Sequence, residues 1–471
     1  MIVDEIDENF CGVLDILNTD EGKCNCHFSV VGDKVTVVPL TQEAENQISC
    51  FPVQKLNKKK YRWLFGYTDT NKAVGMLQTA KMATRIFSSF LGEGYFRTPL
   101  LLQAPSTKIN AIKTFTKIEF YGGIVDLLYP AVKAIEYDTK NKLIRYNDVK
   151  QYTHSYDVKI ERVPFEIIMT IHAPYITSTE IPDLKNKIHS AMVFSFKEPQ
   201  AVDEIVKYYN YALSLFQFCT GRLNIDFSIR LYNKDMLTPI FVKLKDSFAD
   251  YANQYLHITT RVIRLDLLNE SIPVLLKLLQ DKKKKPLLSF LPCINKHDNV
   301  IEKQNVSDLC VAFEREYAKK KKKGEKVLID AAQKLTEDLI KFIDSADSPE
   351  DVMEKAKSIL NSQLKNYSPS LKEKMIYIYK KHADELRSIT ERKEHVDMGI
   401  IKHYSEEEFI EKIGKFVKIR NSVSHVSVEW NEGTEIFIHL KILVYLSVLE
   451  RIGISKSDRM VLAGCLFGHL F

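Results

Sequence analysis

The sequence predicts an α+β protein of two domains: a β-rich antiparallel domain with a sandwich-like arrangement and a packed helix, then an all-α helical bundle. Short runs of β-branched and aromatic residues, separated by turn residues, fill the first 235 positions. After position 305 the apolar residues recur almost everywhere at helical spacing. The length of 471 residues also exceeds what one hydrophobic core normally organises, so two or three domains are expected.

The first predicted domain, residues 1–235, begins with a hairpin. Its strands are CNCHFSVV from Cys24 and KVTVVPL from Lys34, and Gly32 with Asp33 forms the turn between them. A second hairpin is predicted around a turn at 138–141. Further strands are expected to begin near four residues: Tyr61, Lys113, Phe165 and His189. This close spacing of strands favours an antiparallel sandwich or barrel over a parallel sheet.

Helices are predicted in three parts of the chain. One runs from Ala201 to Cys219 inside the first domain, and Gly221 stops it. Residues 236–304 are predicted to be a mostly helical connecting segment. Residues 305–471 form the predicted helical domain, which ends with an apolar helix over 434–452 that we expect at the centre of the bundle.

Composition indicates a globular protein of the cytoplasm. The chain has 45% hydrophobic and 27% charged residues, and its acidic N-terminus lacks the features of a secretory signal. No apolar run approaches the roughly 18 residues that a membrane helix needs. Eight scattered cysteines fit a reducing compartment better than a disulfide framework. The net charge of +6 permits a nucleic-acid partner but does not by itself predict one.

One cluster resembles a set of metal ligands. Cys24, Cys26 and His27 lie together, but no second ligand pair follows at a convincing spacing. Alternation puts both cysteines on one face of a strand, so packing is the favoured interpretation and zinc binding the alternative. P-loop, dinucleotide-binding and HExxH motifs are absent from the sequence, and we therefore predict neither a cofactor nor a metal.

The stretch 405–428 has the strongest functional pattern. Ser405 and Glu408 form a predicted capping box, so a helix should begin there. Its apolar residues lie on one stripe: Phe409, Ile413, Phe416 and Val417. One turn further, the stripe reaches Arg420. A guanidinium on an apolar face is costly unless it has a partner or the face is solvated, so this position is a candidate for chemistry.

Arg420, Asn421 and His425 together suit the cleavage of RNA. The 2′-hydroxyl of RNA is a built-in nucleophile, histidine can transfer protons near neutral pH, and arginine can bind phosphate oxygens. Asn421 could orient the imidazole. On an ideal helix Arg420 and His425 lie about 140° apart, so two copies facing each other would pair them best. The alternative is that both cations only cap the helix end.

The set Arg420-Asn421-Ser422-Val423-Ser424-His425 resembles the R-x4-6-H signature of the HEPN superfamily of ribonucleases. The β-rich first half, the segment LLSFLPCINK at 287–296 and the helix carrying FEREY at 313–317 are similar to the ApeA type of HEPN protein, a group of antiphage defence proteins. The resemblance extends over nearly the whole chain. Its most specific part is the six-residue motif.

The resemblance implies a metal-independent endoribonuclease that acts in abortive infection. The helical domain would form a homodimer and bring two motifs together, leaving a 2′,3′-cyclic phosphate and a 5′-hydroxyl on the RNA, with tRNA as one expected substrate. The first domain would sense a phage-derived trigger. Glu314 and Glu316 are candidate acidic auxiliaries, and surface ion pairs are the other interpretation of these two residues.

Two other functions follow from different interpretations of the same sequence. A catalytically inactive HEPN-fold protein could act as a binding or adaptor protein, although the complete Arg420, Asn421 and His425 set counts against it. A metal-dependent enzyme would instead use Cys24, Cys26 and His27, and EDTA would then abolish its activity.

Overall fold

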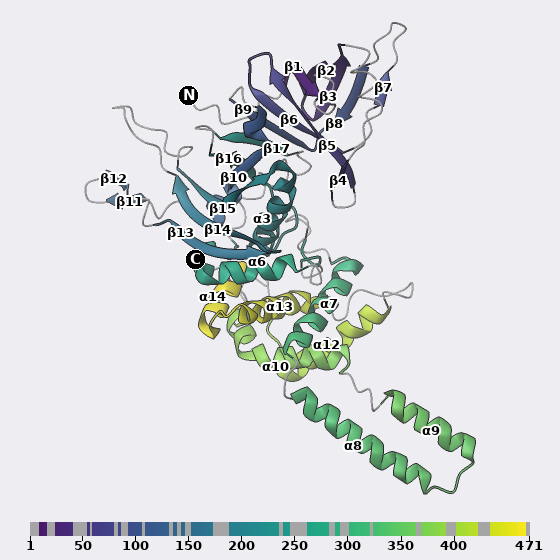
Figure 1. The fold of residues 1–471 in the computed structure, drawn as a ribbon. Coiled ribbons are helices and arrows are strands. Elements are labelled where there is room, and N and C mark those ends of the chain that lie inside the picture. Colours follow the sequence, from purple (N-terminus) through teal and green to yellow (C-terminus); the bar gives the residue numbers. More distant parts are fainter. Residues whose placement is uncertain are drawn as a thin grey trace. The chain divides into compact units, whose positions relative to one another are not determined.

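The chain divides into two units, Met1–Gln280 and Asp281–Phe471, in a computed structural model (Figure 1). The structure describes residues 9–16, 24–40, 54–56, 59–79, 83–85, 93–105, 109–130, 135–138, 143–146, 152–172, 188–234, 239–244, 261–281, 288–292, 301–320, 324–363, 369–391, 402–422 and 434–467. The division lies inside the predicted connecting segment 236–304, whose first part contributes a strand and helices to the first unit.

The first unit is built on an antiparallel sheet. Its strands are β1 (Asn9–Ile16), β2 (Cys24–Val31), β3 (Lys34–Pro39), β4 (Gln54–Leu56), β5 (Lys59–Thr68), β6 (Ala73–Gln78), β7 (Ala83–Arg85), β8 (Glu93–Arg97), β9 (Leu100–Ala104), β10 (Thr114–Tyr121), β13 (His154–Ile160), β14 (Val163–His172), β15 (His189–Ala201), β16 (Ser228–Tyr232) and β17 (Ile240–Leu244). They follow the order β13-β14-β15-β10-β16-β17-β9-β6-β5-β1-β2-β3-β8-β7, and β4 pairs with β5.

The prediction of a β-rich antiparallel first domain is confirmed. Within the described residues, its strands form one continuous hydrogen-bonded sheet rather than the two separate sheets of a sandwich. A separate two-stranded hairpin consists of β11 (Ile135–Asp138) and β12 (Leu143–Tyr146), where the sequence predicts one. The sheet extends beyond position 235 because β17 pairs with β16 on one side and with β9 on the other.

The hairpin of β2 and β3 forms as predicted. Val31 pairs with Lys34, which leaves Gly32 and Asp33 as a two-residue turn, and Gly32 adopts the positive φ of 61° that such turns require. Val35 and Val37 are completely buried, Thr36 between them is partly buried, and Lys34 and Val38 are exposed. Local turn chemistry and alternation are therefore sufficient to fix this register.

Two glycines let β1 and β5 approach each other closely. A Cβ atom on Gly12 would lie 2.0 Å from the carbonyl oxygen of Tyr67, and one on Gly66 would lie 2.3 Å from the carbonyl oxygen of Val13. Both distances are far below van der Waals contact. Only glycine therefore fits at these two positions with the strands in this register.

The helix α3 (Ile205–Thr220) packs against the sheet through aromatic side chains. The ring of Tyr208 lies 6.2 Å from that of Phe115 on β10, 6.0 Å from Phe165 on β14 and 4.6 Å from Phe196 on β15. Gly221 ends the helix at φ 69°, as predicted. The other helices of this unit are η1 (Ile109–Ile112), α2 (Gly123–Leu128), η5 (Val202–Glu204), α5 (Leu265–Leu268), η6 (Asn269–Ser271) and α6 (Ile272–Gln280).

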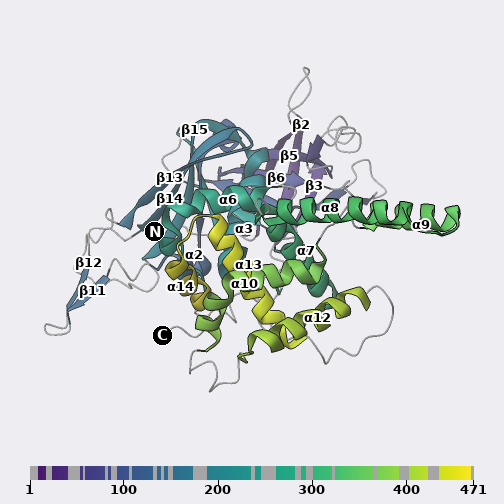
Figure 2. The ribbon, with the colours of Figure 1, turned by 90° about the horizontal axis from the view of Figure 1, so that it is seen from below.

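The described elements of the second unit are all helical, as predicted. They are α7 (Lys303–Lys320), α8 (Gly324–Asp344), α9 (Glu350–Gln363), α10 (Leu371–Thr390), α12 (Glu406–Ser422), η9 (Thr434–Ile436), α13 (Phe437–Arg451) and α14 (Lys456–Phe467). Helix α10 packs against α7, α12, α13 and α14 (Figures 1 and 2). Helix α13 is buried along most of its length, which confirms the prediction that the apolar 434–452 helix is central.

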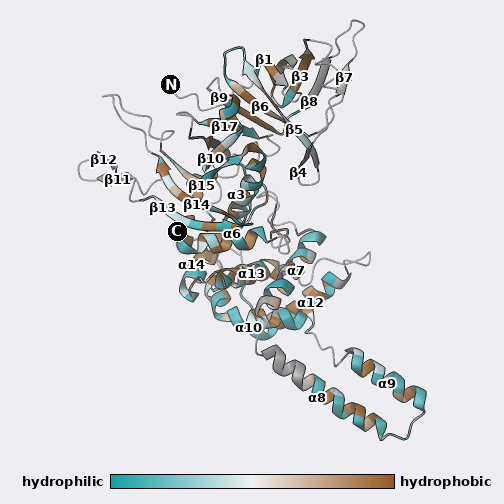
Figure 3. Ribbon diagram, in the orientation of Figure 1, coloured by the Kyte–Doolittle hydropathy of each residue, from teal (hydrophilic) through white to brown (hydrophobic). Residues whose placement is uncertain are grey.

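Helices α8 and α9 pack against each other as a hairpin. Apolar and polar residues are interspersed along α9 and along the coloured part of α8 (Figure 3). Several large apolar side chains on them face solvent: Leu335, Phe342, Val352 and Ile359.

A buried polar network holds a kink in α10. His382 has non-helical backbone angles, and its Nδ1 atom lies 2.8 Å from Glu385 Oε2. The other oxygen of Glu385 accepts hydrogen bonds from Arg459 on α14, with Nε at 2.7 Å and Nη2 at 2.6 Å. A polar interaction therefore ties α10 to α14 inside the core.

Candidate functional site

The helix that carries the motif, α12, begins as predicted. The backbone N–H of Glu408 donates to Ser405 Oγ at 3.2 Å, and the N–H of Ser405 donates to Glu408 Oε2 at 2.9 Å, which completes the capping box. Three glutamates in the first turn complement the positive end of the helix dipole. Phe409, Ile413 and Phe416 are buried against the neighbouring helices, as the stripe predicts, whereas Val417 is only partly buried.

Arg420 lies where this buried stripe meets solvent. It is in the last turn of α12 and its side chain is exposed, although the position continues the line of Ile413 and Phe416. Burial raises the pKa of the Cys310 thiol on α7 to about 12, while the charge of Arg420 lowers it and that of Glu314 raises it. Both charged groups therefore lie near one buried thiol. The end of α12 and the middle of α7 thus bring Arg420 and Glu314 to one region.

The other two motif residues cannot be placed in the same way. Asn421 belongs to α12, but its side chain is outside the described part of the structure. His425 lies outside the described residues altogether. The roles predicted for Asn421 and His425 therefore stay predictions.

Glu314 is a partly exposed carboxylate with a cationic neighbour. Its Oε1 atom lies 3.8 Å from Nζ of Lys374 on α10, and 42% of its side chain is accessible. Lys374 is largely buried and is the additional charged residue that sequence reasoning missed. The sequence around Lys374 does not indicate its contact with Glu314, because that contact depends on how α7 and α10 pack. Glu314 is accessible enough to contact a ligand.

Glu316 has a different environment, although it is only two residues away. It is almost fully buried, and its Oε1 atom lies 2.9 Å from Nη2 of Arg451 at the end of α13. Burial lowers the pKa of Arg451, and the charges of Glu316 and Asp281 act in the opposite direction. These contacts are those of an interior ion pair that joins α7 to α13. The auxiliary role predicted for Glu316 stays a prediction.

The arrangement around Arg420 suits the binding of an anion more than nucleophilic chemistry by the protein. A guanidinium at a helix end can bind two oxygens of a phosphate at once. The nearby Cys310 has a raised pKa and is fully buried, so it stays protonated and inert at neutral pH. Cys310 is therefore not a candidate nucleophile at neutral pH.

Comparison of the chain with protein-family models, with curated proteins and with solved structures finds no match. No described helix has the length and apolar character required to cross a membrane.

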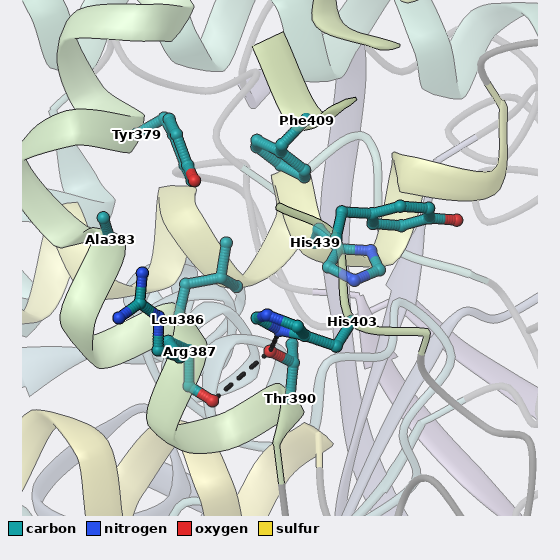
Figure 4. Close-up of a pocket in the computed structure, with 9 residues that line it drawn as sticks. Tyr379, Ala383, Leu386, Arg387, Thr390, His403, Phe409 and His439 are labelled. Atoms are coloured by element: carbon teal, nitrogen blue, oxygen red, sulfur yellow. Dashed lines mark hydrogen bonds between the residues drawn. The ribbon is translucent and has the colours of Figure 1, made fainter. Parts of the chain in front are cut away.

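A small pocket lies at the opposite end of α12, between that helix, α10 and α13 (Figure 4). Thr390 Oγ1 donates to the carbonyl of Arg387 at 3.3 Å and lies 3.3 Å from His403 Nδ1. Phe409 lines this pocket and precedes Arg420 by eleven residues, which corresponds to about 16 Å along the helix. The pocket is therefore separate from the motif.

His439 forms the buried wall of this pocket. Burial lowers its pKa to about 4, with a smaller contribution in the same direction from His403, although a hydrogen bond to the carbonyl of Lys402 opposes the shift. The imidazole is therefore neutral at pH 7, and its Nε2–H donates to that carbonyl at 2.7 Å. This histidine fixes the chain that leads into α12.

The cysteine cluster does not form a ligand set in the described residues. Cys26 is completely buried in the core of the first unit, whereas His27 is exposed on the other face of β2. The side chain of Cys24 is outside the described part. The packing interpretation of Cys26 is confirmed, because alternation along β2 turns the two side chains in opposite directions.

Proposed function

We propose that the chain is a metal-independent endoribonuclease of the HEPN type that acts in antiphage defence. In this proposal Arg420 binds the non-bridging oxygens of the scissile phosphate and stabilises the charge of the phosphorane. His425 is the acid or base, and Asn421 orients its imidazole. The second unit acts as a homodimer that brings two motifs to one cleft, and tRNA is the first substrate class to test.

The observation that carries the proposal is the exposure of Arg420 at the end of an otherwise buried stripe. An arginine that served only the core would be expected to be covered by the bundle, whereas Arg420 reaches solvent from a rigid, well-capped helix. Precise positioning of a charged group on a helix favours stabilisation of a transition state. The partly exposed carboxylate of Glu314 nearby provides a second polar group for the same region.

The proposed reaction needs no external reagent. The 2′-oxygen attacks phosphorus, the bond from phosphorus to the 5′-oxygen breaks, and the 2′-hydroxyl proton passes to a base. A second proton transfer protonates the leaving 5′-oxygen. The two imidazoles of a dimer would be sufficient for both proton transfers. The products are a 2′,3′-cyclic phosphate and a 5′-hydroxyl.

The first unit would regulate this activity in response to a phage-derived trigger. The first unit is compact and has its own extended sheet and aromatic core. A unit of this size can have a role separate from support of the helical unit. The test of nuclease activity does not require the second unit to be expressed without the first. The full chain, with and without phage infection, is the appropriate material.

The test compares RNA from cells that express the wild-type chain, Arg420→Ala, His425→Ala or Lys418→Ala. Lys418 is the matched control: it is an exposed cation on α12, about 200° around the helix from Arg420. We expect losses of about 10²- to 10³-fold in cleavage for Arg420→Ala and of about 10²- to 10⁴-fold for His425→Ala. Lys418→Ala should cleave like the wild type, and EDTA should have no effect.

Two further measurements make the outcome decisive. The RNA ends must carry a 2′,3′-cyclic phosphate and a 5′-hydroxyl, and circular dichroism must show that each variant remains folded. Intact RNA with the wild-type chain in infected and uninfected cells would instead favour the adaptor function. Unfolding of both motif variants would identify Arg420 and His425 as structural residues.

A further inference from the structure

A second cluster of chemically reactive side chains lies in the first unit, on the sheet. Glu119 on β10, His172 on β14 and His189 on β15 each offer one ligand atom, and these atoms all lie within 4.8 Å of one another. His172 Nε2 is 3.4 Å from Glu119 Oε1. The rings of the two histidines are 5.1 Å apart between centroids. Two imidazoles and one carboxylate thus converge on one point.

The sheet itself produces this convergence. β14 and β15 are antiparallel neighbours, and their register places His172 directly opposite His189. β10 pairs with the other edge of β15 and contributes Glu119. The start of β15 is fixed as well, because the N–H of Ser190 donates to Asp126 Oδ1 on α2 at 2.6 Å. The backbone that carries the cluster is therefore held on rigid elements.

Glu119 is oriented so that one carboxylate oxygen faces the histidines. It is almost fully buried, and Tyr232 donates a hydrogen bond to its Oε2 atom, which leaves Oε1 directed toward His172. Arg230 Nη1 is 4.0 Å from Oε1, beyond hydrogen-bonding distance.

We propose that Glu119, His172 and His189 form a binding site for a divalent transition-metal ion, with Zn²⁺ as the reference ion. Imidazole and carboxylate are ligands that such ions prefer. Donors around one tetrahedral ion lie about 3.3 Å apart, so one pair is already at that spacing. The other two pairs lie within 4.8 Å, so small rotations of both histidine side chains would bring all three ligand atoms to that spacing. Three protein ligands leave a fourth position for water or a ligand.

The alternative is that His172 and Glu119 form only an ion pair beside a second histidine. That arrangement does not require His189 to face the pair, whereas a metal site does. The metal proposal goes beyond the nuclease proposed above, because its residues all belong to the first unit. Chelation should remove this ion without affecting RNA cleavage, so the two proposals can fail independently.

The test measures binding of Zn²⁺ and Co²⁺ to the purified, chelator-treated full chain. Equilibrium dialysis with elemental analysis gives the stoichiometry, and the visible absorption of Co²⁺ reports nitrogen and oxygen ligation. We compare the wild type with His172→Ala, His189→Ala and Glu119→Gln. The matched control is His27→Ala, which removes an exposed histidine next to the cysteines on β2.

We expect the wild type and His27→Ala to bind one ion at this site with equal affinity. His172→Ala and His189→Ala should each bind at least about tenfold more weakly. Because His172 is accessible, its replacement should leave the fold intact, which melting curves would verify. Equal metal affinity in the wild type, His172→Ala and His189→Ala would overturn the proposal, as would loss of the ion in His27→Ala alone. Absence of binding by the wild type would also overturn it.

Discussion

The carboxylate of Glu316 on α7 lies 2.9 Å from Nη2 of Arg451 on α13, with both side chains largely shielded from water. We predict that Glu316→Ala lowers the free energy of unfolding by about 3–5 kcal/mol, because it leaves a guanidinium buried without its counter-charge. Glu314→Ala is the matched control on the same helix. It should cost less than about 1 kcal/mol, since its ion pair with Lys374 is long and partly solvated. Urea unfolding measures the free energy of unfolding of both variants. Equal destabilisation by the two substitutions would contradict the prediction.

The buried imidazole of His439 makes stability depend on pH. The unfolded chain binds a proton at this residue below about pH 6.5, whereas burial holds the folded-state pKa at about 4. Stability should therefore fall as the pH is lowered through this interval, by about 3 kcal/mol from this group at pH 4.

The variant His439→Gln tests this pH dependence, because glutamine can still donate to the carbonyl of Lys402 but does not titrate. Unfolding free energies of the variant should change less than those of the wild type between pH 7 and about pH 4. His403→Gln, on the same pocket, leaves His439 and its burial in place and removes only the smaller contribution of His403, so it should keep most of the wild-type slope. A slope unchanged in His439→Gln would show that other groups cause the acid sensitivity.

The close approach of β1 and β5 predicts that Gly12→Ala is strongly destabilising. Its Cβ would meet the carbonyl oxygen of Tyr67 at 2.0 Å, so the strands must separate, at a cost of at least about 2 kcal/mol. Gly414→Ala on α12 should have the opposite sign, because a methyl group there meets only the flexible side chain of Lys372 at 3.4 Å. It should stabilise the protein by about 0.5–1 kcal/mol. Thermal unfolding distinguishes the two, and similar melting temperatures would refute the prediction.

The network around Glu385 should also respond to acid, in a lower range of pH. Burial raises the pKa of this carboxyl, but hydrogen bonds and charge from His382 and Arg459 outweigh that effect and lower it. A lowered carboxyl pKa contributes stability above about pH 4.5 that is lost as the pH falls through the folded-state pKa. The difference in unfolding free energy between the wild type and Glu385→Gln should thus be largest at pH 7. It should shrink as the pH falls below about 4.5.

Asp384→Asn is the control for Glu385→Gln, because Asp384 is the preceding carboxylate and makes an exposed ion pair with Lys456. This pair also lowers the pKa of Asp384, but solvent screens it, so the pH profile of Asp384→Asn should differ from that of the wild type much less than that of Glu385→Gln does. A constant difference between wild type and Glu385→Gln at every pH would show that the carboxylate charge does not cause the effect.

Local features of the fold could be predicted from the sequence because neighbouring residues determine them. The turn at Gly32 and Asp33, the stop at Gly221 and the capping box of Ser405 and Glu408 each depend on a few adjacent residues, and each is present. The order of the strands could not be predicted in this way. It depends on which distant segments share a core, so the expected separate sheets became one continuous sheet.

The same limit applies to the candidate sites. Helical spacing predicts the face of α12 on which Arg420 lies, but it does not indicate that Cys310 and Glu314 are nearby on α7. The partner of Glu316 is far along the chain and has no sequence signal. In contrast, the sequence predicts strands that begin near Phe165 and at His189, and in the structure His172 ends β14 and lies opposite His189 at the start of β15.

The position of β17 in the sheet affects how the first unit folds during its synthesis. β9 is synthesised early, yet its neighbour on one side, β17, emerges from the ribosome only about 140 residues later. Contacts between segments so far apart in the chain slow folding, because the entropy of closing the loop is lost before the contacts form. The sheet therefore cannot be completed progressively from the N-terminus. Its central strands must wait for most of the unit to be translated.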